Sequence, residues 1–316
     1  MRAMTYASYG GPEKLELVER EAPVVEDGRV LVRVAASSVN PIDWKRAAGG
    51  LRLIMPACFP IVAGYDVAGE VVEVGANVEG LAVGDLVHAR IGEHAGGACA
   101  ELASVGADVV AKVPSGMDLG EAAGLPLAGL TALQGLRDQA KLPLENARER
   151  VLVVGASGGV GHLAVQIARA AGATVVGVCS ARNEDLVRSL GAHEAVDYAA
   201  PDPYRGQAPF DVVLDCVAGD PAPFVKLLGP GGRYASCLPG PAVFARSALN
   251  PILDKKVRPV LLKSRATDLQ ILDRLVERGA LRVVVDSRFP LAELGEAWAR
   301  SMTGRAVGKI VVDVAG

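Results

Sequence analysis

A glycine-rich stretch offers the clearest chemistry in the sequence. Residues 151–161 read Val-Leu-Val-Val-Gly-Ala-Ser-Gly-Gly-Val-Gly, and an amphipathic apolar pattern continues to residue 171. A short buried strand, a glycine loop and a helix, in this order, are typical of the turn that binds the pyrophosphate of a dinucleotide. Relative to the GxGxxG pattern, Ala156 replaces the first glycine, whereas Gly158 and Gly161 match. The expected cofactor contacts in this loop are Ala156, Ser157, Gly158, Gly159, Val160 and Gly161.

The residues after the next strand, 174–179, bear on the choice of cofactor. NAD-binding proteins usually place an acid about 20 residues after the loop, where it binds the ribose 2′-hydroxyl. Here the strand is followed by Ser180, Ala181, Arg182 and Asn183, and no acid comes before Glu184. Ser180 can donate a hydrogen bond and Arg182 can pair with a phosphate. The sequence therefore favours NADPH over NADH, with a solvated surface role for Arg182 as the alternative.

The elements that must position these residues fall into three regions. Short β-type runs broken by closely spaced glycines fill residues 1–118 and predict a compact β-rich domain. Strands and helices alternate over residues 119–250, which predicts a doubly wound parallel sheet. Residues 251–316 hold a helix, 268–278, and two β-type segments, 281–286 and 309–314, that we expect to rejoin the first domain.

Composition excludes several classes of protein. The chain has 316 residues, with 33 Lys and Arg against 36 Asp and Glu, so no broad basic surface for nucleic acid is expected. No apolar run reaches the roughly 18 residues that cross a bilayer, and the polar, mixed-charge N-terminus is not typical of a signal or transit peptide. The five cysteines form no CxxC pair and the four histidines no HExxH pair, which indicates reduced thiols, a cytoplasmic protein and no metal.

Motifs spread along the whole chain together resemble the medium-chain dehydrogenase/reductase superfamily, in its zinc-independent NADPH:quinone oxidoreductase and enone (alkenal) reductase branch. They are GGPEKLEL near the start, VNPIDWKR at 39–46, GYDVAGEV at 64–71, GDLV at 84–87, LTA at 130–132, the glycine loop, VDY at 196–198 and GKIV at 308–311. The resemblance implies an α/β fold, with a GroES-like β-rich catalytic domain (1–118 and 251–316) and a Rossmann domain that binds NADPH (119–250).

The resemblance also bears on metal and chemistry. Asn40 stands where zinc-dependent members carry a cysteine, and Gly64-Tyr65-Asp66 replaces their Gly-His-Glu motif. Because an Asn/Tyr pair is a poor zinc ligand set, the expected reaction is metal-free hydride transfer to an electron-poor acceptor. Quinones and α,β-unsaturated carbonyls are acceptors of this kind, and the cofactor supplies the hydride.

The resemblance further assigns individual residues. Asn40 is expected beside the nicotinamide or the substrate oxygen, and Lys45 and Tyr65 are the candidate proton donors. A surface lysine and a packed aromatic are the respective alternatives, and Asp43 is interpreted as a structural cap. The remaining cofactor contacts implied are Thr131 at the nicotinamide end, Tyr198 at the 2′-phosphate end, Leu238 through its backbone, and Val217 and Lys309.

Three further alternatives concern substrate, turnover and assembly. A basic run at Lys255, Lys256 and Arg258, continued by Lys263 and Arg265, is either a solvated connection or a rim for the phosphates of a 2-enoyl-CoA thioester. The chain could also be an NADPH-binding protein with little turnover, in which case changing Asn40, Lys45 or Tyr65 would have no effect. The resemblance implies a homodimer joined at a Rossmann sheet edge near residues 233–238.

Overall fold

The computed structural model describes residues 1–91, 96–217 and 219–315, and these divide into two compact units. The first unit comprises residues 1–128, 263–277 and 283–316, and the second comprises residues 129–262 and 278–282. His94, one of the histidines considered above, lies outside the described residues. No helix in the described ranges has the length and apolarity needed to cross a membrane.

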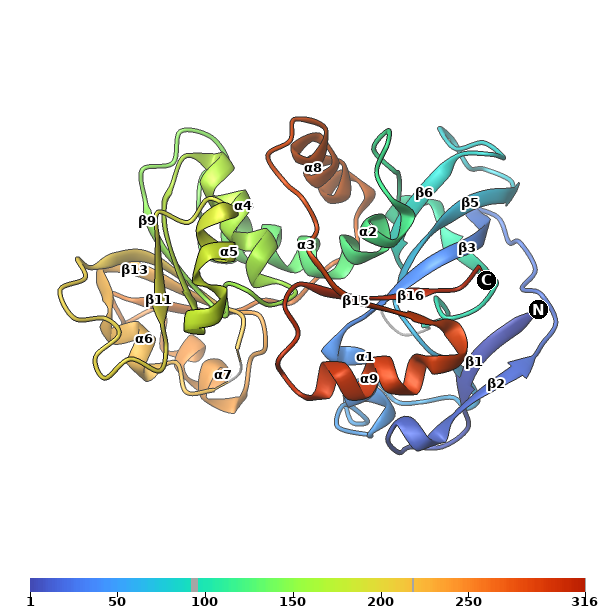
Figure 1. The fold of residues 1–316 in the computed structure, drawn as a ribbon, viewed down its shortest axis with the longest axis horizontal. Coiled ribbons are helices and arrows are strands. Elements are labelled where there is room, and N and C mark those ends of the chain that lie inside the picture. Colours follow the sequence, from blue (N-terminus) through green and yellow to red (C-terminus); the bar gives the residue numbers. More distant parts are fainter. Residues whose placement is uncertain (92–95, 218, 316) are drawn as a thin grey trace. The chain divides into compact units, whose positions relative to one another are not determined.

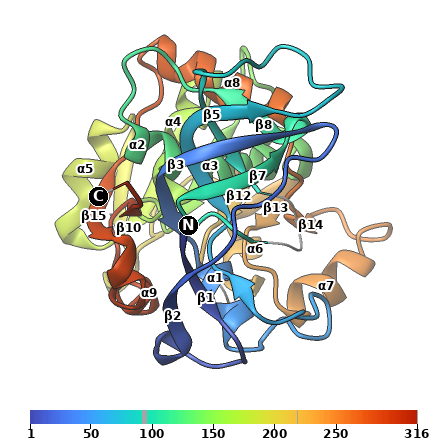
Figure 2. The same ribbon diagram turned by 90° about the vertical axis from the view of Figure 1, so that its right-hand side faces the viewer.

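The first unit is built on a mixed, largely antiparallel sheet of seven strands. The strand order is β15-β16-β3-β5-β6-β8, and β7 pairs with β3 (Figures 1 and 2). A three-stranded sheet, β2-β1-β4, completes the unit. Its elements are β1 (Arg2–Tyr6), β2 (Leu15–Glu19), β3 (Arg29–Val39), α1 (Pro41–Ala47), β4 (Ile61–Val62), β5 (Asp66–Val74), β6 (Leu86–Arg90), β7 (Leu102–Gly106), β8 (Val110–Lys112), α2 (Leu119–Gly124), α8 (Ala266–Glu277), β15 (Val285–Pro290), α9 (Leu294–Met302) and β16 (Lys309–Asp313).

The two C-terminal strands join this sheet, although the first of them, β15, begins at Val285 and not at the predicted residue 281. β16 pairs antiparallel with the second half of β3, so that Ile310 lies opposite Val39, and β15 pairs parallel with β16. Valine-rich strands and the buried Trp298 of α9 form the core of the unit. This pairing brings residues from the two ends of the chain into one packed layer.

The second unit is a six-stranded, fully parallel sheet in the order β11-β10-β9-β12-β13-β14. Helices α4 and α5 pack against β9, β10 and β11 (Figure 1). Its elements are β9 (Arg150–Val154), α4 (Gly161–Ala171), β10 (Thr174–Cys179), α5 (Glu184–Ser189), β11 (Glu194–Asp197), β12 (Phe210–Asp215), α6 (Ala222–Lys226), β13 (Leu228–Ser236), α7 (Pro241–Ala248) and β14 (Lys256–Pro259), and helix α3 (Pro126–Gln134) straddles the unit boundary.

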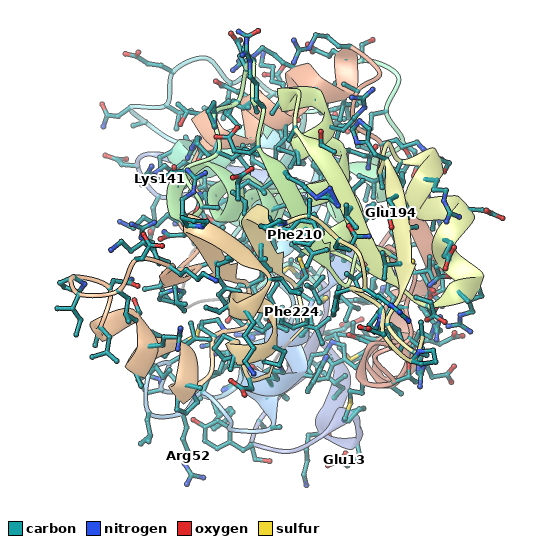
Figure 3. The ribbon with its side chains drawn as sticks, turned by 90° about the vertical axis from the view of Figure 1, so that its left-hand side faces the viewer. Glu13, Arg52, Lys141, Glu194, Phe210 and Phe224 are labelled. Carbon is teal, nitrogen blue, oxygen red and sulfur yellow. The ribbon has the colours of Figure 1, made fainter. Side chains whose placement is uncertain are left out.

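The central strands of this sheet read as continuous apolar runs because both faces are covered. The buried residues Leu152, Val176 and Val213 form one cluster with Phe210, and Phe224 packs against its margin (Figure 3). Short 3₁₀ segments occur at Pro12–Lys14, Ala107–Val109, Ala181–Asn183 and Leu291–Glu293, and a π-helical turn at Gly135–Gln139. The two units together confirm the predicted α/β class with a β-rich domain and a doubly wound parallel sheet.

The edge strands of the parallel sheet are β11 and β14, which corrects one expectation. Residues 233–236 belong to β13, which has β12 on one side and β14 on the other. A strand paired on both sides cannot extend the sheet into a second molecule. The sequence missed β14 because its residues, Lys256–Pro259, lie in the basic run.

Candidate active site

The glycine loop lies between the end of β9 and the start of α4. Gly155 has a φ of +76°, a left-handed conformation that suits glycine. The Ala156 N–H then donates to the Val178 carbonyl at 2.8 Å, which fixes the loop to β10. The left-handed residue of this turn is therefore Gly155. The comparison with the GxGxxG pattern began at Ala156 and did not include Gly155 in the candidate site.

Two glycines in the loop are required for different reasons. A Cβ at Gly161 would lie 2.0 Å from the Gly155 carbonyl oxygen, so only glycine permits α4 to begin so close to the loop. A Cβ at Gly158 would lie 3.3 Å from the same oxygen, and Gly158 is partly exposed. The missing side chains leave a cradle of backbone at the N-terminus of an 11-residue helix, which fits a pyrophosphate.

The residues expected at the 2′-phosphate lie at the carboxyl ends of β10 and β11. Cys179 is in register with Asp197, and the Tyr198 N–H donates to the Cys179 carbonyl at 3.0 Å. This pairing brings the backbone of Tyr198 beside that of Ser180. Arg182 is exposed and makes no hydrogen bond or ion pair with another described residue.

Asn183 belongs to this region, although the sequence did not single it out. Its Nδ2 donates to the Ser157 hydroxyl at 3.0 Å. The bond ties the turn after β10 to the glycine loop, so the two expected phosphate sites are held together. In the sequence, only its position next to Arg182, an expected phosphate contact, could have pointed to Asn183. Such a neighbour is too common to predict a role.

The other expected cofactor residues of this unit are spread over three elements. Val217 and Leu238 follow β12 and β13, and Val217 donates its N–H to the Asp215 carboxylate at 2.8 Å. Both side chains are at least partly exposed. Thr131 is buried in α3. The carboxyl edge of the parallel sheet thus carries the loop, the Ser180 turn, Tyr198, Val217 and Leu238, and this edge is where α/β proteins bind nucleotides.

In the first unit, Asn40 is the centre of a buried polar network. Its Oδ1 accepts a hydrogen bond from the Lys309 ammonium at 2.7 Å, and its Nδ2 donates to the Asp66 carboxylate at 2.8 Å. The Ser38 hydroxyl and the Leu127 N–H also donate to Asp66, at 2.8 and 2.9 Å. The amide of Asn40 is therefore held from both ends, between a cation and an anion.

Lys309 is almost fully enclosed, with 3% of its surface exposed. Its Nζ lies 3.8 Å from the nearest Asp66 oxygen and donates to the Val39 carbonyl at 3.3 Å. Burial lowers the pKa of Lys309, and the Asp66 and Asp43 carboxylates oppose this shift. The sequence placed Lys309 among the cofactor contacts, and in this structure its hydrogen bonds go to Asn40 and Val39.

Asp43 has the capping role that the sequence indicated. One carboxylate oxygen accepts the Asn40 N–H at 2.6 Å at the start of α1. The other oxygen is buried and has no hydrogen-bond partner among the described residues. Burial raises the pKa of Asp43 to about 7, with the Asp66 charge adding to the shift and the Asn40 N–H opposing it.

The Asp43→Asn variant should therefore alter the pH dependence of stability. Because the folded-state pKa lies above the unfolded value of about 3.9, protonated Asp43 stabilises the fold below about pH 4, and this contribution is lost as the pH rises through about 7. Asparagine keeps the acceptor for the Asn40 N–H and does not titrate. Between about pH 4 and pH 7, Asp43→Asn should gain on the order of 4 kcal/mol of stability relative to the natural protein. Urea unfolding from pH 5 to pH 8 should show about 3 kcal/mol of this gain.

Asp85→Asn provides the matched control for this experiment. The hydrogen bond from Lys112 holds the pKa of Asp85 below its usual range, so its contribution to stability is constant above pH 5. If the unfolding free energies of Asp43→Asn and the natural protein run parallel from pH 5 to pH 8, Asp43 does not titrate in this range.

The two candidate proton donors, Tyr65 and Lys45, each contact other side chains of this unit. The buried Tyr65 hydroxyl accepts a hydrogen bond from Arg46 at 2.7 Å, and the Arg90 guanidinium lies 5.5 Å from the centre of its ring. Burial raises the pKa of Tyr65, although Arg46 acts in the opposite direction. Lys45 places its Nζ 5.4 Å from the centre of the Trp44 ring. Asn40 and Lys309 thus share one network, whereas Tyr65 and Lys45 contact other partners.

Comparison with known families agrees with this architecture. Residues 26–124 match the alcohol dehydrogenase GroES-like domain, and residues 190–312 match the zinc-binding dehydrogenase family. With a GroES-like fold, a parallel sheet and a glycine loop at its edge, the chain belongs to the medium-chain dehydrogenase/reductase superfamily and is an oxidoreductase.

Individual relatives define the branch. A chloroplast envelope quinone oxidoreductase homolog of Arabidopsis thaliana is 40% identical over 99% of this chain and 98% of its own. An NADPH-dependent alkenal/one oxidoreductase of the same plant is 35% identical over 99% of this chain and 79% of its own. The solved structure of a quinone oxidoreductase from Coxiella burnetii superposes with a TM-score of 0.88, at 31% identity over 99% of each chain. The suspected branch of quinone oxidoreductases and alkenal reductases is thereby confirmed.

The zinc named by one family description does not fit the residues of this chain. The Asn40 oxygen already accepts from an ammonium, and the Tyr65 oxygen accepts from a guanidinium. A dication at this position would also face the Lys309 charge, 3.8 Å from Asp66. Within the described ranges, no three His, Cys, Asp or Glu side chains gather in an arrangement that could hold a metal.

Proposed function

We propose that this protein is an NADPH-dependent, metal-free reductase that transfers hydride to a quinone or to the activated C=C bond of an α,β-unsaturated carbonyl. The observation that carries the proposal is the Lys309–Asn40–Asp66 network. A buried ammonium with two hydrogen-bond acceptors occupies the region where zinc-dependent relatives are expected to bind metal. Without a Lewis acid, the acceptor must already be electron-poor. Bound NADPH would supply the hydride.

The chain's own residues would divide the work as follows. The glycine loop and the α4 N-terminus bind the pyrophosphate, and Ser180, Arg182 and Tyr198 bind the 2′-phosphate. Asn40, held rigidly at both ends of its amide, orients the acceptor oxygen. Its longer hydrogen bond, from Nδ2 to the Ser38 carbonyl at 3.4 Å, is the one that can be exchanged for a substrate oxygen. Lys45 or Tyr65 then delivers the proton that completes the reduction.

Steady-state oxidation of NADPH tests this function. The protein is assayed with a chelator present against a benzoquinone, a short enone and a short 2-enoyl-CoA. Turnover of the benzoquinone or the enone supports the proposal. A clear preference for the 2-enoyl-CoA would instead indicate that the substrate is a thioester. Asn40→Ala should lose turnover and keep NADPH binding. Tight binding of NADPH without turnover of any acceptor would favour the low-turnover binding protein.

The contacts of the basic run argue against its role as a phosphate-binding rim for a 2-enoyl-CoA thioester. The Lys255 and Arg258 side chains donate to the backbone carbonyls of Val225 and Gln139, at 3.2 and 2.8 Å. Lys256 donates to the carbonyls of Asn250, at 2.7 Å, and Leu253. Cations engaged in this way hold loops and strand ends together, and fewer remain to bind the phosphates of a coenzyme.

The choice of NADPH predicts the effect of a charge change at Arg182. Arg182→Gln removes a cation that can pair with the 2′-phosphate, so the KM for NADPH should rise about tenfold while that for NADH stays the same. Arg188→Gln is the control, because Arg188 is also exposed and its charge is paired with Glu184 at 2.8 Å. Equal changes for both cofactors, or an NADH preference in the natural protein, would contradict this assignment.

Two properties of the whole protein belong to the same proposal. We expect a homodimer joined through the open edge of β14, which lies beside the predicted segment 233–238, and native mass spectrometry can test the oligomeric state. We also expect the protein to act in the cytoplasm, because its cysteines are free, as in a reducing compartment.

A further inference from the structure

Two cysteines lie side by side at the carboxyl edge of the parallel sheet. Cys216 directly follows β12 and Cys237 directly follows β13, and these strands are neighbours (Figure 2). Their sulfur atoms are 3.9 Å apart, and both residues are partly exposed. The other cysteines are Cys58, which is exposed, and Cys99 and Cys179, which are buried.

The strand register places the two backbones at a distance suited to a disulfide. Asp215 is in register with Ser236, and the ladder continues because the Cys237 N–H donates to the Asp215 carbonyl at 2.8 Å. Neighbouring strands lie about 4.8 Å apart, and disulfides join Cα atoms separated by about 4.4–6.8 Å. The sulfurs can therefore approach from 3.9 Å to about 2.05 Å chiefly by rotation of the two side chains.

The pair is also adjacent to the glycine loop. The Cys216 N–H donates to the Val154 carbonyl at 3.1 Å, at the last residue of β9. A Cβ built on Gly155 would lie 3.7 Å from the Cys216 Cβ and 2.8 Å from a methyl group of Val217. Val217 and Leu238, both expected cofactor contacts, each follow one of the two cysteines. A bond between the cysteines would therefore act on the backbone beside the first residue of the loop.

We propose that a peroxide converts Cys216 and Cys237 into a reversible disulfide, and that this disulfide weakens the binding of NADPH to the parallel-sheet unit. The second half of the proposal rests on the proposed function, whereas the first half concerns the thiols alone. The site thus couples the oxidation state of its surroundings to cofactor occupancy.

The chemistry needs one two-electron oxidant. One of the two thiols, as its thiolate, attacks one peroxide oxygen, the O–O bond breaks, and a sulfenic acid and hydroxide form. The other sulfur, 3.9 Å away, then displaces water from the sulfenic acid as the S–S bond forms. In sum, hydrogen peroxide and two thiols give a disulfide and two waters, and a dithiol reductant reverses the change.

The test treats the intact protein with hydrogen peroxide, alkylates the remaining thiols and analyses the peptides by mass spectrometry. NADPH affinity is measured by fluorescence on the same samples. We expect a Cys216–Cys237 cross-linked peptide and an affinity lowered about tenfold, both restored by dithiothreitol. Cys216→Ser and Cys237→Ser should keep their affinity after peroxide, whereas Cys58→Ser should respond as the natural protein does.

Each half can fail separately. Recovery of both cysteines as free thiols, or as sulfinic acids without a cross-link, would overturn the disulfide. A cross-link with unchanged NADPH affinity would overturn its effect on the cofactor. If the reduced protein does not bind NADPH, the proposed function fails and the effect on the cofactor fails with it, while the peptide analysis still decides whether the disulfide forms.

Discussion

A Gly161→Ala protein should lose about two orders of magnitude in kcat/KM with NADPH. The added methyl group would lie 2.0 Å from the Gly155 carbonyl oxygen and 2.9 Å from the Ala156 Cα, and both neighbours are backbone. The start of α4 must therefore move away from the loop by about an ångström, and a displacement of that size at a binding group costs about 100-fold. The overpacked contact should also lower the free energy of unfolding by about 1–3 kcal/mol.

Gly158→Ala separates cofactor binding from folding. Its methyl group would lie 3.3 Å from the same oxygen, which a small adjustment can accommodate, so the unfolding free energy should change little. NADPH binding should still weaken, because the methyl group would occupy the cradle. Steady-state kinetics and urea unfolding on both variants provide the comparison. Natural activity and stability in Gly161→Ala would show that the loop and α4 do not pack as described.

The second large effect is expected at Lys309. Lys309→Met keeps the length of the side chain and removes its charge, which leaves the Asn40 oxygen without its shortest donor and the buried Asp66 without its ammonium. Removing one partner of a buried ion pair typically costs about 3–5 kcal/mol. Urea unfolding should show a loss of that size, and turnover should fall because Asn40 is no longer fixed.

Lys112→Met is the matched control for the same substitution. Lys112 pairs with Asp85 at 2.9 Å, but its side chain is 56% exposed, and such pairs contribute about 0–1 kcal/mol. Lys309→Arg retains charge and donors, so it should fall between the natural protein and Lys309→Met. A Lys309→Met protein that loses no more stability than Lys112→Met would show that the buried network contributes little to the fold.

The parts of the site that depend on local pattern could be predicted from the sequence. The strand at 151–154, the glycine loop and the helix to residue 171 follow from apolar spacing and glycine positions, and the structure places β9 and α4 there. The pattern alone could not show that Gly155 takes the left-handed conformation, because it records residue types and not backbone angles.

The buried network could not be assembled from the sequence in the same way. Asn40 and Lys309 are 269 residues apart, and they meet only because β16 pairs with the end of β3. The resemblance placed each residue near a site, but their mutual hydrogen bond depends on that strand register. Asp66 and Arg46 complete the contacts of Asn40 and Tyr65. Both lie in motifs noted in the sequence, at 64–71 and 39–46, but residue type alone did not indicate these hydrogen bonds.

The edge strand β14 was not predicted because its composition is misleading. A run of lysine and arginine indicates solvent exposure, yet Val257 is buried and the neighbouring cations reach backbone carbonyls. Long basic side chains can satisfy carbonyls at the ends of helices and loops while the backbone between them pairs in a sheet. The composition of such a segment reports its average polarity. Whether it forms a strand depends instead on the few alternate residues, such as Val257, that face the core.

The pairing of β16 with β3 also sets an order on synthesis at the ribosome. One edge of β3 pairs with β7 along residues 29–33. The rest of that edge, residues 36–39, stays unpaired until residues 310–313 of β16 have been synthesised. The parallel-sheet unit is translated in between, so it can finish folding while the first sheet still has an open edge. An open strand edge in a nascent chain favours mispairing and recruits chaperones. The first unit is therefore completed only after residues 310–313 have been synthesised, and its Asn40–Lys309 contact forms no earlier than that.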